Sequence, residues 1–128
     1  MSELSVLLVE DNPRNLKLAR DVLEHAGFAV TAVTSGEEVL AAARTAAPDV
    51  ILMDLQLPGI DGHAALSRLR ADPLTAGIPV VAVSAFAMQV DRDRALASGF
   101  DGYLMKPISV REFPEQVRGH ARGPDGAP

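Results

Sequence analysis

The segment Val50–Asp54 reads VILMD, an apolar run that ends in a carboxylate. Two further runs resemble it, LSVLLV at Leu4–Val9 and PVVAV at Pro79–Val83. A weaker run at Phe28–Val33 and a short one at Asp101–Met105 complete the set. Nearly continuous apolar strands are typical of a parallel sheet that is covered on both faces.

Stretches with helical periodicity lie between these strands. One apolar stripe, spaced three or four residues apart over Leu16–Ala26, stops at Gly27, where a helix C-terminal cap is expected. Another helix is predicted over Val90–Ser98 and would end at Gly99. Strands and helices therefore alternate along the chain.

Three sequence signals mark the starts of other helices. Ser35–Glu38 and Ser109–Glu112 both read S-x-x-E, the pattern of a capping box, and Asp61 is suited to cap a third helix. Pro114 falls about five residues after Ser109, where a helix interior would lose a hydrogen bond. The last helix should therefore start late, kink or fray.

The alternation predicts an α/β fold of the flavodoxin-like (βα)5 type. Five strand–helix units build a right-handed, doubly wound parallel sheet, for which we expect the strand order 2-1-3-4-5. The chain has 128 residues, enough for one domain. We expect this domain to span residues 1–122, followed by a disordered tail at 123–128.

Composition excludes several classes of protein. The chain has no cysteine, which excludes disulfides and thiolate metal sites. No secretory signal is recognisable, and the apolar runs are far too short to cross a membrane. The net charge is −5, and no stripe of Lys and Arg offsets it, so nucleic acid is not an expected partner. We expect a cytoplasmic protein.

The strand ends carry the candidate chemistry. The first strand is followed by Glu10 and Asp11, the third ends in Asp54, the fourth leads into Ser84, and the fifth is followed by Lys106. In an open α/β sheet, ligands bind outside the carboxyl ends of the strands. With strands one and three adjacent, the three acids would meet in one crevice.

Three neighbouring carboxylates repel one another and call for a cation. Their hard oxygen ligands, without His or Cys, suit Mg²⁺. Asp54 would then be a nucleophile toward a phosphoryl group, with Lys106 and the Ser84 hydroxyl binding phosphoryl oxygens. Taken singly, each of these residues also has an ordinary reading as a cap, a turn residue or a surface charge; the combination is what is specific.

The sequence at this point resembles the receiver domains of bacterial two-component response regulators. The resemblance covers about residues 4–121 and rests on four motifs, VEDN at Val9–Asn12, ILMDLQLPGIDG at Ile51–Gly62, PVVAVSAFAM at Pro79–Met88 and GYLMKPIS at Gly102–Ser109. Within the family, the last two are most similar to single-domain cell-cycle receivers of the DivK type and to receivers of hybrid histidine kinases.

The resemblance implies a metal site and a phosphoacceptor. Asp54 would accept the phosphoryl group. Asp11, Asp54 and the backbone carbonyl of Gln56 would bind Mg²⁺, with Glu10 contributing through water. The Glu-Asp pair stands where many relatives have Asp-Asp, a common variant.

The resemblance also implies a switch. Lys106 would bond the phosphoryl group, and its peptide bond to Pro107 would be cis. Ser84 would be the switch hydroxyl, and Tyr103 the aromatic residue that turns inward when Ser84 moves toward the phosphate.

The function implied is that of a response regulator rather than an enzyme with turnover. A phosphohistidine on a sensor kinase or a phosphotransfer protein would be the donor. Output would be phosphorylation-dependent binding of a protein target on the face built from the fourth helix, the fifth strand and the fifth helix. No membrane partner is expected.

Two residues near the site suggest a slow loss of the phosphoryl group. Gln56 and Phe86 lie two positions beyond Asp54 and Ser84, close to the path of an attacking water. The apolar Phe86 cannot orient that water, so self-dephosphorylation should be slow; alternatively, Phe86 is a contact for a partner. Phe86, Met88 and Val90 could form an apolar edge for docking.

Three rival functions remain open. A hydrolase of the haloacid-dehalogenase type also uses a strand-end Asp, but its acid–base Asp would stand at Gln56. A flavodoxin-like cofactor protein needs a phosphate-binding loop after the first strand, where the acidic Glu10-Asp11 pair stands. A receiver that only scaffolds would not need the intact set of polar residues.

Overall fold

The computed structural model describes residues 4–57, 59–85 and 89–121, and within them the fold is a five-stranded parallel sheet. The strand order is β2-β1-β3-β4-β5, as the sequence predicts. The strands are β1 (Ser5–Val9), β2 (Ala29–Val33), β3 (Val50–Asp54), β4 (Val80–Ser84) and β5 (Gly102–Met105).

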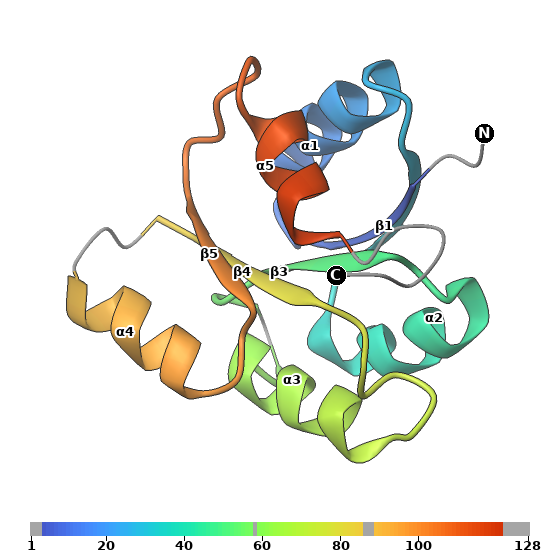
Figure 1. The fold of residues 1–128 in the computed structure, drawn as a ribbon, viewed down its shortest axis with the longest axis vertical. Helices are drawn as coiled ribbons and strands as arrows, with labels where there is room; N and C mark the ends of the chain where they lie inside the picture. Colours follow the sequence, from blue (N-terminus) through green and yellow to red (C-terminus); the bar gives the residue numbers. More distant parts are fainter. Residues whose placement is uncertain (1–3, 58, 86–88, 122–128) are drawn as a thin grey trace.

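Helices cover both faces of this sheet (Figure 1). They are α1 (Pro13–His25), the short 3₁₀ helix η1 (Gly36–Glu38), α2 (Val39–Ala46), α3 (Gly62–Ala71), α4 (Gln89–Ala97) and α5 (Phe113–His120). In Figure 1, α1 and α5 lie on one face, and α2, α3 and α4 lie on the other. Two apolar cores result, one on each side of the sheet.

The central strand β3 contributes to both cores. Ile51 and Met53 pack into the core under α2 and α3, and Leu52 packs into the core under α1 and α5. All five residues of β3 are buried, because the strand has neighbours on both edges and helices on both faces. This explains why its sequence is apolar without alternation up to the terminal Asp54.

The two S-x-x-E segments do not begin their helices as a capping box would. Ser35 makes no side-chain capping bond, so the predicted capping box is wrong, and a 3₁₀ turn precedes α2 instead. Ser109 does accept a hydrogen bond from the backbone N–H of Glu112, at 3.3 Å. The helix α5 then begins at Phe113, so Pro114 occupies the first turn, where its missing N–H has no intrahelical acceptor. Of the three outcomes expected for this helix, the structure shows the late start.

A single arginine ties the amino-terminal ends of β4 and β5 to α3. Arg70 donates to the carbonyls of Ile78 and Gly99 at 2.8 and 3.1 Å, and to the Asp101 carboxylate at 2.7 Å. The same carboxylate oxygen accepts from the backbone N–H of Val80 at 2.8 Å. This Arg70 clamp fixes the starts of two strands whose other ends carry Ser84 and Lys106.

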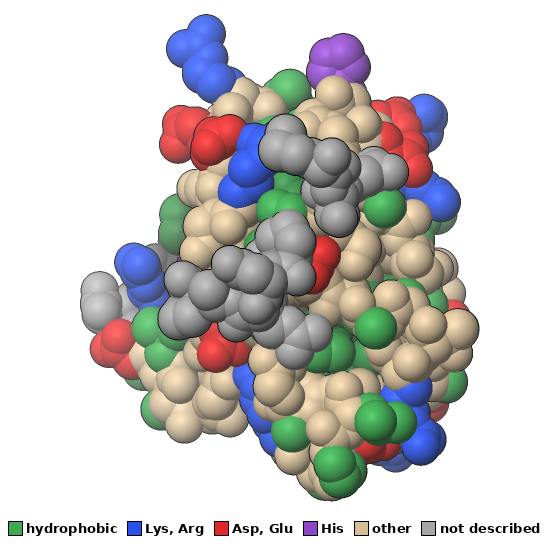
Figure 2. All heavy atoms as spheres, turned by 45° about the vertical axis from the view of Figure 1, so that its right-hand side comes forward, with side chains coloured by type: hydrophobic (Ala, Val, Ile, Leu, Met, Phe, Trp, Pro, Cys, Tyr) green, Lys and Arg blue, Asp and Glu red, His purple; other side chains and the backbone are tan. Residues whose placement is uncertain are grey.

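Acidic and basic side chains are interspersed over the face seen in Figure 2, which brings forward the right-hand side of Figure 1. Such mixing is ordinary for a globular protein with a moderate net charge. None of the helices in the described part of the chain combines the length and the apolar character that a membrane crossing requires.

Candidate functional site

The carboxyl ends of β1 and β3 bring three acids together. In the sheet, Val9 pairs with Met53, so the residues that follow them leave the sheet side by side. Glu10, Asp11 and Asp54 each place one carboxylate oxygen within 4.8 Å of the others. Glu10 and Asp54 are buried at 5% exposure each, whereas Asp11 is exposed. The crevice expected from the sequence is therefore present.

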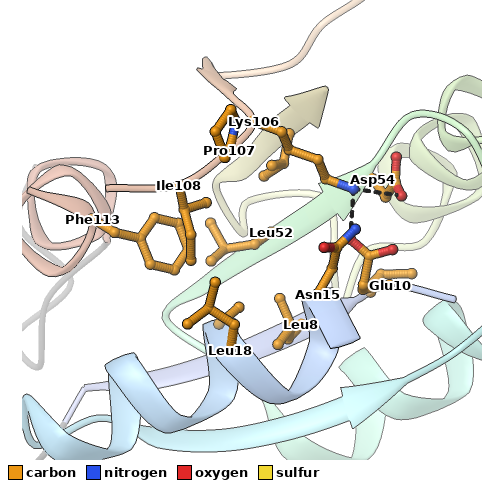
Figure 3. A pocket seen from close by; sticks show the side chains of 13 residues that line it. Leu8, Glu10, Asn15, Leu18, Leu52, Asp54, Lys106, Pro107, Ile108 and Phe113 are labelled. Carbon is orange, nitrogen blue, oxygen red and sulfur yellow. Dashed lines mark hydrogen bonds and ion pairs between the residues drawn. The ribbon is translucent and has the colours of Figure 1, made fainter. Parts of the chain in front are cut away.

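The Lys106 ammonium enters this cluster from the end of β5. Its Nζ atom lies 2.6 Å from Glu10 Oε1 and 3.0 Å from Asp54 Oδ2 (Figure 3). All three side chains are largely withdrawn from solvent. One cation thus bridges two buried carboxylates, and little water screens the Coulomb attraction between them, which offsets the cost of burying the charges.

The cluster perturbs two of its own pKa values. Burial raises the pKa of Glu10 above its ordinary 4.5, and Asp54 raises it further, against the lowering effect of Lys106 and of the Asn12 N–H. Burial lowers the pKa of Lys106, but its contacts with Glu10 and Asp54 outweigh this and raise that pKa above 10.5. Two buried carboxylates share one ammonium, so one additional cation would be strongly favoured here.

Backbone N–H groups orient the two buried carboxylates. The N–H of Asn12 donates to Glu10 Oε2 at 3.1 Å, and the N–H of Gln56 donates to Asp54 Oδ1 at 2.9 Å. Asn12 in turn caps α1, because its side-chain oxygen accepts from the N–H of Arg14 at 2.9 Å. Each carboxylate therefore uses one oxygen for a backbone donor and the other for Lys106.

Ser84 and Tyr103 lie on the two strands next to the cluster. Ser84 ends β4, is fully buried, and its carbonyl accepts the backbone N–H of Lys106 at 2.8 Å. Tyr103 lies on β5 opposite Ala82 and is buried at 9% exposure. The bond between Lys106 and Pro107 is cis, as the resemblance implies.

The remaining residues that the sequence predicts for the site either have no described side-chain contact with the acidic cluster or lie outside the described residues. Gln56 lies two residues after Asp54 and is exposed, and the role of its carbonyl as a metal ligand stays a prediction. Phe86 and Met88 lie outside the described residues, and their predicted roles stay predictions. Val90, on α4, is 59% exposed, as an apolar docking edge requires.

Sequence reasoning missed two features of the site. It gave Glu10 only a role toward the metal, whereas this carboxylate makes the shorter contact to Lys106. It also missed a small apolar pocket of about 70 Å³ beside the acids (Figure 3). Its walls are made by α1, the central strands and the segment after β5, and include Leu18, Leu52, Lys106, Ile108 and Phe113. No sequence period signals this pocket, because its walls come from separate elements.

Comparison with known proteins identifies a family whose name agrees with the resemblance seen in the sequence. Residues 6–118 match the family model described as response regulator receiver domain. Over 116 residues the chain is 44% identical to the polar-differentiation response regulator DivK of Brucella ovis, a match that covers 91% of this chain and 94% of that protein.

Solved structures agree in fold. A response regulator from Chloroflexus aurantiacus superposes with a TM-score of 0.86 at 30% identity, covering 92% of this chain and 97% of that one. The receiver domain of sensor histidine kinase PA1611 from Pseudomonas aeruginosa superposes with a TM-score of 0.84 at 34% identity, covering 93% of this chain and 98% of that one. That structure has a magnesium ion coordinated in its active site cleft. With the acids, the lysine and the fold in agreement, this chain belongs to the family of response regulator receiver domains.

Proposed function

We propose that this receiver accepts a phosphoryl group on Asp54 from a phosphohistidine and signals by phosphorylation-dependent binding to a protein target. The donor would be a sensor kinase or a histidine phosphotransfer protein. The observation that carries the proposal is the position of Asp54, buried at the end of the central strand and held between Lys106 and two further acids.

The residues around Asp54 suit phosphoryl transfer, which depends on positioning and charge neutralisation more than on covalent help. A carboxylate oxygen of Asp54 would attack phosphorus, forming the new O–P bond as the bond from phosphorus to the donor nitrogen breaks. The Gln56 N–H, 2.9 Å from Asp54 Oδ1, fixes the plane of the carboxylate before the attack.

The acids fit a divalent metal with hard oxygen ligands. Asp11 and Asp54, the Gln56 carbonyl, and Glu10 through water are the residues that would hold Mg²⁺. When bound, Mg²⁺ would neutralise charge on the phosphoryl oxygens. Lys106 would bond one of those oxygens, which requires its ammonium to give up part of its contact with Asp54.

The output would follow from the same contacts. Phosphorylation adds charge and acceptor oxygens at Asp54. Ser84 and Lys106 then gain a new partner, and Tyr103 would adjust on β5. Because Ser84 and Lys106 are joined by a backbone hydrogen bond, a shift of either strand end is passed to the other. The face built from α4, β5 and α5 is the proposed target surface.

The proposal is tested by incubating the chain with acetyl phosphate and Mg²⁺ and measuring intact mass. The wild type should gain one base-labile phosphoryl adduct, and Asp54→Asn should gain none. Asp49→Asn is the matched control, since Asp49 precedes the same strand at its opposite end, where its carboxylate accepts the N–H of Ser5. An adduct that persists in Asp54→Asn would exclude Asp54 as the acceptor.

A further inference from the structure

The strand β2 forms one edge of the sheet, and in the described part of the chain it pairs with β1 alone. Ala29 donates its N–H to a carbonyl just before β1, and the carbonyl of Val33 accepts the N–H of Glu10. Backbone groups alternate in direction along a strand, so the N–H and C=O groups of Val30 and Ala32 point out of the sheet. They form a template onto which a further strand can pair.

This edge lacks the charges and the prolines that commonly keep edge strands from pairing. Residues 26–36 contain no charged side chain and no proline, in a chain whose composition is 23% charged. Ala29 and Thr31 are exposed on β2. The edge strand β5 differs, because Asp101 precedes it and Lys106 follows it. The edge at β2 is therefore the one that is open to strand pairing.

The sequence of β2, AVTAV, is complementary to itself about a two-fold axis. Two copies can pair antiparallel with the axis at Thr31. Ala29 of each copy then lies opposite Val33 of the other. Val30 likewise lies opposite Ala32, and their outward N–H and C=O groups face each other as a hydrogen-bonded pair. A small residue thus faces a β-branched one on each side of the axis, and the two threonines face each other.

We propose that β2 is a self-association surface on which a second copy of this chain pairs antiparallel. The two sheets would then form one continuous sheet, and the two-fold axis closes the contact, so that it does not propagate into a fibre. The strand has five residues, which bury less area than a standard protein interface. Association should therefore be weak and reversible.

The charges beside this edge permit the contact. The helix α1 packs on β2 and would approach its own copy next to the junction. Its exposed charges are balanced by i,i+4 ion pairs, Lys17 with Asp21 and Arg20 with Glu24. The net charge of −5 on each chain still opposes association at long range, and salt screens it. Added salt should therefore strengthen the dimer.

A segment of another protein fits this edge less well than a second copy does. A charged segment would find no opposite charge on residues 26–36. A second copy brings an uncharged strand whose side chains match those of β2 at each position. The match in side-chain size and polarity therefore favours the chain itself as the occupant.

The inference goes beyond the proposed function and does not depend on phosphoryl transfer. The strand β5 lies at the opposite edge of the sheet from β2, so it would lie at each outer edge of the joined sheet. Both acidic clusters and both proposed target surfaces would remain available. A dimer of this kind would be bivalent, and a target with two binding segments would be held more tightly than by one copy.

The test is sedimentation velocity of the full-length chain over a range of concentrations, without acetyl phosphate. The wild type should show a reversible monomer–dimer equilibrium. Thr31→Lys and Thr31→Asp should each weaken it by about tenfold, because like charges would face each other at the axis. An equimolar mixture of the two variants should form the dimer again, because Lys then faces Asp.

Two further variants separate the edge from charge and from folding. Thr45→Lys makes the same charge change on the exposed surface of α2 and should dimerise at least as well as the wild type. Ala32→Pro removes an outward N–H and should weaken the dimer while the circular dichroism spectrum stays unchanged.

Four outcomes would overturn the proposal. They are a monomer at all concentrations, an undiminished dimer in Thr31→Lys, no recovery in the mixture, and an equal loss in Thr45→Lys. Phosphoryl uptake is measured in parallel by intact mass, and Thr31→Lys should retain it. A failure of self-association would thus be distinguished from a failure of the proposed function.

Discussion

The strands β3 and β5 both lead into the acidic cluster, but they are held very differently. The strand β3 has a neighbour on each edge and is buried along its whole length. The strand β5 pairs with β4 alone and ends in the half-exposed Met105. The helix α4 lies beside it, and among the described residues of α4 only Ala95 is buried. The proposed acceptor therefore lies on a strand that is held on both edges, and the proposed response lies on an edge strand that is held on one.

Core truncation gives the largest expected difference between these two regions. Leu52→Ala on β3 removes a fully buried side chain and should lower the free energy of unfolding by about 2–5 kcal/mol. Met105→Ala on β5 should change it by about 0.5 kcal/mol or less, because that side chain is already half exposed. Urea denaturation measures both. Equal losses would show that the edge is as tightly packed as the centre.

Removal of the Arg70 clamp should loosen the edge while the centre stays intact. Arg70→Ala removes the guanidinium donor from the carbonyls of Ile78 and Gly99 and from the Asp101 carboxylate, which keeps the N–H of Val80. We expect a loss of about 1–3 kcal/mol in the free energy of unfolding. Amide hydrogen exchange should rise in β5 more than in β3. Arg70→Lys should recover only part of the loss, because an ammonium lacks the planar fork of the guanidinium.

The burial of Glu10 beside Asp54, at the end of the central strands, should give the stability of the fold a pH dependence. The raised pKa of Glu10 means that the folded state binds its proton more tightly than the unfolded state. Without metal, the free energy of unfolding should therefore fall as pH rises from 4.5 through the raised value, and Glu10→Gln should lack this fall. Urea titrations in a chelating buffer measure the slope, and an identical slope in Glu10→Gln would contradict the assignment.

The ion pairs that Lys106 forms with Glu10 and Asp54 should affect stability in the alkaline range. The raised pKa of Lys106 adds stability that is fully present below pH 10.5 and is lost as pH rises through the raised value. Lys106→Met should therefore be less sensitive than the wild type to pH in the alkaline range. The measurement is again urea denaturation. Asp21 also raises the pKa of Lys17, but that pair is exposed and screened by water, so Lys17→Met should change the alkaline pH dependence less than Lys106→Met.

Helix caps give the smallest expected effects. Asn12 accepts two backbone N–H groups at the start of α1, next to the centre, so Asn12→Ala should cost about 1 kcal/mol. Ser109 accepts one, at 3.3 Å from Glu112, in the turn that leads into α5 next to the edge, and Ser109→Ala should cost about 0.5 kcal/mol. The thermal midpoints of the two variants, compared with that of the wild type, rank them. A reversed order would show that the edge helix depends more on its cap.

Sequence reasoning found the sheet and the cluster because both follow from short-range patterns. An apolar run followed by a polar residue marks a buried parallel strand and its carboxyl end, and sheet topology alone then places Glu10, Asp54 and Lys106 together. Gly27 and Gly99 likewise ended their helices as predicted, with φ of +99° and +110° that an L side chain rarely adopts.

Features that depend on contacts between distant segments were not predictable in this way. The S-x-x-E pattern is the same at Ser35 and Ser109, yet Ser35 makes no capping bond, and Ser109 accepts the N–H of Glu112 in the turn before α5. The Arg70 clamp joins α3 to Gly99 and Asp101, which lie 29 and 31 residues further along the chain. No periodicity encodes such a contact, and in the sequence Arg70 looks like any solvated helix charge.

The place of Lys106 in two cavities has a thermodynamic consequence. Its side chain lines the pocket beside Asp54 and also a groove over β5, which Arg92 of α4 and Gln116 of α5 line on the proposed target surface. A single residue is therefore shared by phosphorylation and target binding. Linkage then requires reciprocity: the factor by which phosphorylation changes target affinity is the factor by which the bound target changes the phosphorylation equilibrium. A target that prefers the phosphorylated chain would thereby also favour retention of the phosphoryl group.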